Sequence, residues 1–254
     1  MSAPIVEILP DKPALVQRAL TLVIEAIQNA VANHGYCTLA LAGGSTPKPL
    51  YAALATQDLP WENLYIFWGD ERYVPVEHPD SNAGMAKSVW LDQVPIPHDQ
   101  VFMTPTAEGD PAISAQQFEA NLRQAFGPLQ GLAPDEVPRF DLILLGMGDD
   151  GHTASLFPHT AALGVSDRLI TVGYKGSDPR ITFTVPLINH SRRVLFLVAG
   201  ADKQTALAQV FAPEGDDLAY PSRLVRPRGE LRWLLDRQAV GDQGLLSSPQ
   251  AEED

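Results

Sequence analysis

A group of ionisable residues follows a short apolar run near the middle of the chain. Residues 140–145 read FDLILL, which has the length and branching of a buried strand. A glycine-rich turn ends this run, and Asp149, Asp150 and His152 come directly after it. Glycine lets a ligand approach the backbone, and open α/β sheets carry their chemistry at the C-terminal ends of strands. We therefore expect His152 to be a catalytic residue that moves a proton.

Three other interpretations of this segment are weaker. A lone histidine in a loop is more often a surface residue, but here a strand, a glycine turn and two acids coincide with it. Gly146, Gly148 and Gly151 match the dinucleotide pattern G-x-G-x-x-G. We reject a dinucleotide site because Asp149 and Asp150 would place two negative charges where a pyrophosphate has to bind. One histidine and two acids without a cysteine cluster are also a weak metal-ligand set.

A second glycine-rich turn consists of Gly43, Gly44, Ser45 and Thr46. It lies between a predicted strand and a predicted helix that starts at Pro47 with Thr46 as its cap. Backbone N–H groups and hydroxyls at the positive end of a helix dipole favour an anion. From this motif alone, a plain capped turn is an equally good interpretation. The turn is neither a P-loop nor a serine-hydrolase elbow, because the lysine of the first and the second glycine of the other are missing.

The net charge of −13 argues against nucleic acid as a partner. The same field repels an anionic substrate, so a phosphorylated ligand has to be captured by a local group of basic side chains. Arg180, which follows Ser177-Asp178-Pro179, and Lys203, at a predicted helix start, are the candidates for a phosphate clamp. Taken singly, each has the features of an ordinary surface charge.

The order of the predicted elements indicates an α/β fold. Helices are expected over residues 14–33, 47–54, 81–91, from 110 onward and around 201–211, and strands over 36–42, 63–68, 140–145, 169–173, 181–185, 194–199 and 231–235. Strands that alternate with helices are typical of a mostly parallel sheet with helices on both faces. Without a repeat or a clear linker, we expect a single domain over residues 1–240 and a disordered acidic tail over 241–254.

The sequence also bears on the compartment. No apolar run approaches the roughly 18 residues of a membrane helix, and the N-terminus lacks the features of a secretory signal. The single cysteine, Cys37, excludes an internal disulfide framework and suits a reducing compartment. We therefore expect a soluble, cytoplasmic protein with no membrane partner.

Several segments together resemble the 6-phosphogluconolactonase family. They are GGSTP at 43–47, GDERYVP at 69–75, SN at 81–82, GMGDDGHTASLFP at 146–158, PRIT at 179–182 and AGADK at 199–203. The resemblance implies a Rossmann-like fold, shared with glucosamine-6-phosphate deaminase. It also implies hydrolysis of a phosphosugar lactone in the oxidative pentose phosphate pathway, without a metal or organic cofactor. We expect a monomer or a weak homo-oligomer.

The resemblance assigns roles to the candidate residues. His152 would take a proton from the attacking water, and Asp150 or Asp70 would orient its imidazole. Arg180 and Lys203 would hold the substrate phosphate together with the 43–46 turn. The sugar pocket would include Arg72 and Asn82.

Two alternative functions remain. The related deaminases use a glutamate five residues after the histidine, but this chain has Phe157 there, and it carries Arg72 where they carry a tyrosine. Both differences favour lactone hydrolysis. A non-catalytic sugar-phosphate sensor would keep the clamp but would not need His152.

Overall fold

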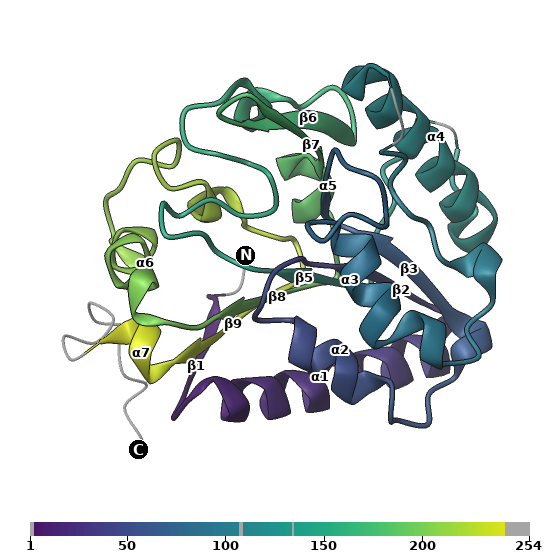
Figure 1. The fold of residues 1–254 in the computed structure, drawn as a ribbon, viewed down its shortest axis with the longest axis horizontal. Helices are drawn as coiled ribbons and strands as arrows, with labels where there is room; N and C mark the ends of the chain where they lie inside the picture. Colours follow the sequence, from purple (N-terminus) through teal and green to yellow (C-terminus); the bar gives the residue numbers. More distant parts are fainter. Residues whose placement is uncertain (1–2, 107–108, 134, 242–254) are drawn as a thin grey trace.

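A parallel sheet forms the centre of the fold (Figure 1). In residues 3–106, 109–133 and 135–241, which the computed structural model describes, six parallel strands lie in the order β1-β9-β8-β5-β2-β3. They are β1 (Ile5–Leu9), β2 (Cys37–Leu41), β3 (Leu64–Trp68), β5 (Leu142–Leu145), β8 (Arg193–Val198) and β9 (Glu230–Asp236). A smaller antiparallel sheet has the order β4-β7-β6 and consists of β4 (Asp70–Arg72), β6 (Ile170–Lys175) and β7 (Asp178–Phe183).

Helices cover both faces of the central sheet. They are α1 (Lys12–His34), α2 (Lys48–Leu54), α3 (Asn82–Val89), α4 (Pro111–Gln130), α5 (Val185–Asn189), α6 (Gln204–Phe211) and α7 (Arg237–Val240). In Figure 1, α1 and α2 lie below the sheet, whereas α5 and the small sheet lie above it. None of the described helices is long and apolar enough to cross a membrane.

Side chains alternate between two apolar cores on opposite faces of the central sheet. On β5, Leu142 and Leu144 pack into the core that α1, α2 and α3 cover, whereas Ile143 and Leu145 pack into the core that α4 to α7 cover. Because both faces are buried, such a strand reads as a continuous apolar run. The predicted mostly parallel sheet with helices on both faces is confirmed.

The first helix agrees with its prediction, whereas the predicted cap of the second helix is wrong. Asp11 caps α1 through a 2.8 Å hydrogen bond from the Ala14 N–H, and Gly35 ends it at a φ of 86°. The prediction that Thr46 caps the second helix is wrong. The carbonyl of Pro47 accepts the first helical hydrogen bond, so the cap position falls on a residue without a side-chain acceptor.

Three strand predictions also need correction. No strand was predicted at β1, an edge strand whose Ile5 and Ile8 are 40% and 49% exposed. Residues 70–72 lie just beyond the strand predicted over 63–68, but they form a separate strand, β4, because β7 pairs with them. The strand predicted over 181–185 ends at Phe183, since the Val185-Pro186 pair starts α5. Apart from Gly241, which follows α7, the predicted tail lies outside the described residues.

Candidate functional site

A cavity of about 420 Å³ opens at the C-terminal ends of β2, β3, β5 and β8. In the sheet, β2 lies between β3 and β5. The chain passes from β2 to β3 on one side, and it later returns to form β5 on the other side of β2. The loops after these two strands diverge there, which is where open α/β sheets bind their ligands. The cavity is lined by the predicted residues Gly43, Gly44, Ser45, Thr46, Asp70, Arg72, Asn82, His152, Arg180 and Lys203.

The remaining predicted residue, Asp150, supports His152 from beside the cavity. Its Oδ1 lies 2.5 Å from His152 Nδ1 and 3.0 Å from the His152 backbone nitrogen. Burial alone would raise the pKa of Asp150, but the hydrogen bonds from His152 outweigh this effect and lower the pKa to about 2. A carboxylate at Nδ1 fixes the proton on that nitrogen, which leaves Nε2 as the proton acceptor of the neutral ring.

Gly148 makes room for this pair. Its N–H donates a 2.8 Å hydrogen bond to the His152 carbonyl, which closes the turn on itself. A Cβ at this position would lie 2.0 Å from His152 Nδ1 and 2.7 Å from Asp150 Oδ1. Only glycine therefore leaves the imidazole and the carboxylate in contact.

We expect Gly148→Ala to displace the imidazole and to lower kcat by about 10- to 100-fold, since supporting contacts of this kind are worth that much. The fold should persist, because the displaced groups are side chains at a cavity edge. Steady-state kinetics and thermal melting check this, with Gly164→Ala as the control, since a Cβ there meets no atom within 4 Å. Unchanged kcat in Gly148→Ala would show that the contact between the ring and the carboxylate does not matter.

Two arginines face each other in the small sheet. Arg72 on β4 and Arg180 on β7 are paired in register, and both line the cavity. The Nε atom of each is buried without a hydrogen-bond partner, although Arg72 Nη1 donates to the Asp80 carbonyl at 2.5 Å. Burial and the neighbouring Arg72 charge lower the pKa of Arg180. Like charges directly opposite each other destabilise a sheet, and a bound anion would offset this repulsion.

Phe157 lies close to both His152 and Arg180. Its ring centroid lies 4.5 Å from that of His152 and 5.5 Å from Arg180 Cζ. The side chain is 5% exposed. The wall between the histidine and the arginine is therefore an aromatic ring, with no group that can carry a proton.

Two lysines complete the basic lining. Lys203 Nζ lies 2.8 Å from Asp202 Oδ2, so its charge is partly compensated. Lys175, at the end of β6, also lines the cavity. Lys175 was not among the residues predicted from the sequence, where the only signal was a basic residue beside Gly176.

Asp70 has a different role from the one predicted for it as an alternative to Asp150. Its Oδ2 accepts a 2.6 Å hydrogen bond from the Ser155 hydroxyl, and its carbonyl accepts one of 2.9 Å from Asn82 Nδ2. Of the two acids, Asp150 is therefore the one that binds the imidazole. A Cβ on Gly43 would lie 1.8 Å from Asn82 Oδ1, so the first glycine of the 43–46 turn is needed for this close approach.

Glu71 holds the start of α3 in place. It is 2% exposed, and its carboxylate accepts hydrogen bonds from the Ser81 hydroxyl (3.0 Å) and from the backbone N–H groups of Asn82 (2.8 Å) and Ala83 (2.7 Å). Burial raises the pKa of Glu71, against the opposing effect of these N–H groups. The sequence shows the acid beside a strand but not that it binds a helix N-terminus.

We expect Glu71→Ala to lower the free energy of unfolding by about 2–4 kcal/mol, because it leaves buried donors without partners. Glu71→Gln keeps one acceptor oxygen and should lose less. Urea denaturation of the three proteins checks this. Equal stability of wild type and Glu71→Ala would contradict the anchoring role.

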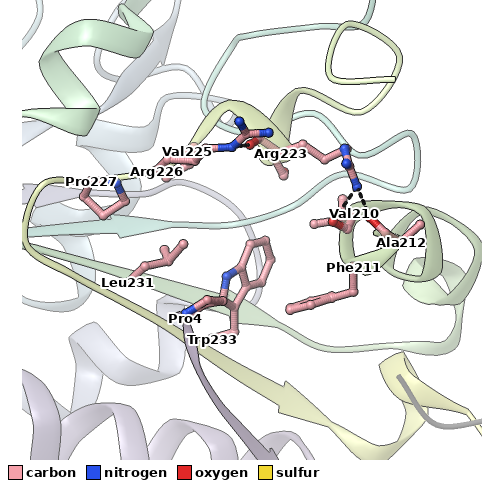
Figure 2. Close-up of a pocket in the computed structure, with 11 residues that line it drawn as sticks. Pro4, Val210, Phe211, Ala212, Arg223, Val225, Arg226, Pro227, Leu231 and Trp233 are labelled. Atoms are coloured by element: carbon pink, nitrogen blue, oxygen red, sulfur yellow. Dashed lines mark hydrogen bonds between the residues drawn. The ribbon is translucent and has the colours of Figure 1, made fainter. Parts of the chain in front are cut away.

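A second cavity, of about 290 Å³, has a different character (Figure 2). It lies beside Trp233 and contains none of the predicted site residues. The Arg223 side chain at its rim donates to the carbonyls of Val210 and Ala212 at 2.9 and 2.8 Å and to Asp217 at 2.9 Å. This arginine is therefore occupied in holding the end of α6. Ser222 and Arg226, which also line the cavity, bind the Gly151 carbonyl and Asp217.

No group of three or more His, Cys, Asp or Glu side chains that could hold a metal ion occurs in the described part of the chain. The polar cavity offers one imidazole, held by a carboxylate, that can accept a proton, and several cationic side chains that can bind an anion.

Known proteins share this arrangement of elements and sequence. The family model described as glucosamine-6-phosphate isomerases/6-phosphogluconolactonase matches residues 10–233. Proteins named 6-phosphogluconolactonase from Nostoc sp. and Synechocystis sp. are 57% and 58% identical, over 92% and 93% of this chain and 96% and 97% of their own lengths. The structure of 6-phosphogluconolactonase from Trypanosoma cruzi superimposes on this chain with a TM-score of 0.84. The two sequences are 30% identical, and the match covers 95% of this chain and 98% of the other. A monomeric glucosamine-6-phosphate deaminase, 20% identical with a TM-score of 0.73, shows the common fold alone.

Proposed function

Because the chain belongs to the family of glucosamine-6-phosphate isomerases and 6-phosphogluconolactonases, we propose that it hydrolyses 6-phosphoglucono-δ-lactone to 6-phosphogluconate. The observation that carries the proposal is His152, held by Asp150, in the same cavity as two arginines that each have a buried Nε without a hydrogen-bond partner. A general base and an anion site are what this reaction requires.

In the mechanism, His152 activates water. A δ-lactone is an activated ester, so water can attack the carbonyl carbon without a covalent enzyme intermediate. Nε2 of the neutral ring takes the proton from the attacking water, and the ionised Asp150 stabilises the imidazolium that results. The imidazolium then returns the proton to the ring oxygen as the carbon–oxygen bond of the tetrahedral intermediate breaks. The oxyanion is held by backbone N–H groups of a glycine turn.

The substrate is held by its phosphate. Arg180, Lys203 and the 43–46 turn form the phosphate clamp, and Arg72 and Asn82 line the sugar pocket. The buried, unpartnered Nε of Arg180 supports this assignment, because a phosphate oxygen would provide the missing acceptor. The proposal also includes three predictions from the sequence. They are a single domain over residues 1–240, a monomer or weak homo-oligomer, and a cytoplasmic role in the oxidative pentose phosphate pathway.

The deaminase and the sensor fit the cavity less well. Deamination with ring opening needs a second proton relay, and Phe157 occupies that place as a buried apolar ring against His152. A sensor would not need an imidazole whose tautomer is fixed by a carboxylate.

The test is hydrolysis of fresh 6-phosphoglucono-δ-lactone by the purified protein, compared with the spontaneous rate in the same buffer. We expect fast hydrolysis and much weaker activity on unphosphorylated gluconolactone. Hydrolysis no faster than the spontaneous rate would refute the proposal. If the protein then still binds sugar phosphate without turnover, the non-catalytic sensor is the remaining function.

Asp150→Asn should lower kcat by about 10- to 100-fold, since the amide no longer stabilises the imidazolium. Because the pKa of Asp150 falls from its usual 3.8 to about 2, the folded state gains stability above pH 4 and loses that gain as the pH falls toward 2. The difference in Tm between wild type and Asp150→Asn should therefore vanish at the acid end. A difference in Tm that grows on acidification would contradict the stabilising contact between Asp150 and His152.

A further inference from the structure

A third cavity, of about 370 Å³, lies at the opposite end of the central sheet from the substrate cavity. The last turns of α1 form one wall, and the residues that precede β5 and start β8 form the other. Its charged and titratable lining consists of His34, Arg139, Asp141, Arg192 and Arg193. Three arginines thus converge in a chain that has 18 basic and 31 acidic residues.

The acid in this group is already matched. Asp141 is 4% exposed, and its two oxygens accept from the Thr38 N–H at 2.9 Å and the Thr38 hydroxyl at 2.8 Å, and contact His34 Nε2 at 3.0 Å. Arg192 Nε lies 3.2 Å from the same carboxylate. Asp141 therefore balances Arg192 and leaves the other two arginines uncompensated.

Arg139 and Arg193 have no acidic partner among the described residues. The backbone of Arg139 is fixed by Gln130, whose amide contacts its N–H and carbonyl at 3.0 and 2.7 Å, while its side-chain Nε is buried without a partner. Arg193 lies opposite Glu230 in the sheet, but that carboxylate binds Arg232 at 3.0 Å instead.

The substrate cavity shows the same combination. There, too, arginines without an acidic partner line a cavity, and a guanidinium Nε is buried with no acceptor. Leaving such a donor unpaired is costly, and an oxyanion in the cavity would supply the missing acceptor. We propose that the cavity formed by His34, Arg139, Asp141, Arg192 and Arg193 binds a small oxyanion, as inorganic phosphate or a phosphate monoester.

This second anion site is separate from the substrate cavity. No residue lines both cavities. Asp141 precedes β5 and Gly146 follows it, so these two residues lie about 16 Å apart along the strand axis. Occupancy of one site can therefore be changed without altering a side chain of the other.

The test is a titration followed by amide chemical shifts in ¹H–¹⁵N spectra, first with inorganic phosphate and then with glycerol 3-phosphate. We expect the amides of Ala30, His34 and Val194 to respond as one group and those of Gly44 and Gly69 as another, with different dissociation constants. The two dissociation constants at the first group are then compared. A lower value for inorganic phosphate identifies free phosphate as the ligand, and a lower value for glycerol 3-phosphate identifies a phosphate ester. No response at the first group with either probe would overturn the proposal.

Arg139→Gln combined with Arg193→Gln should weaken binding at the first group about tenfold or more, with the second group unchanged. The matched control is Arg228→Gln combined with Arg237→Gln, which removes the same charge from exposed positions outside the cavity. If both double variants weaken phosphate binding equally, the effect comes from the net charge of the protein, and the proposed site is refuted. If the first pair does not fold, Arg193→Gln alone supplies the same comparison against Arg237→Gln.

Discussion

His152→Ala is expected to lower kcat on 6-phosphoglucono-δ-lactone by about 10²–10⁴-fold, the range of general acid–base catalysis. The fold should be retained, because the imidazole lies at the cavity edge and its side chain is 20% exposed. KM should change far less than kcat, since the phosphate contacts remain. Stopped-flow assays with fresh lactone and a thermal melt measure both quantities.

The control for this prediction is His98→Ala, at an exposed position outside the cavity, which should keep full activity. A buffer base such as free imidazole should partly restore turnover of His152→Ala, because the space left by the ring admits it. A folded His152→Ala protein with near wild-type kcat would show that another group takes the proton.

Arg180→Gln is expected to raise KM for the phosphorylated lactone by about 10–100-fold, since a hydrogen bond to a charged group is worth about 1.5–3 kcal/mol. Hydrolysis of unphosphorylated gluconolactone should change little, because it has no phosphate for the arginine to hold. Added salt should raise the wild-type KM as well, since the attraction is electrostatic.

Arg237→Gln provides the matched control for charge, as this exposed residue lies outside the cavity. The informative measurement is the ratio of kcat/KM for the two lactones in each variant. Equal losses on both substrates in Arg180→Gln would assign the arginine to the fold or to the chemistry instead of the phosphate.

The predictions from sequence were good where the signal is local. The run before Gly146 is apolar because both faces of β5 are buried, and the turn after it has to carry glycine because His152 and Asp150 fill the space beside Gly148. Ten of the eleven predicted site residues line one cavity, because parallel strands end at the same edge of a sheet.

The predictions failed where a role depends on a distant partner. Ser155 binds Asp70 across 85 positions of the sequence, and Glu71 binds the start of α3 across 12. The pairing of β4 with β7 places Arg72 opposite Arg180, and it exists only once the small sheet forms. Local propensity contains none of this information.

We propose that this site hydrolyses a phosphorylated lactone and does not deaminate an amino sugar phosphate. The most direct measurement is a side-by-side assay of the purified protein with 6-phosphoglucono-δ-lactone and with glucosamine 6-phosphate, following acid release and ammonia release. Phe157 beside His152 offers no second proton carrier, so we predict rapid lactone hydrolysis and no detectable ammonia. Steady ammonia production at a rate comparable to lactone hydrolysis would contradict the assignment of this protein as a lactonase.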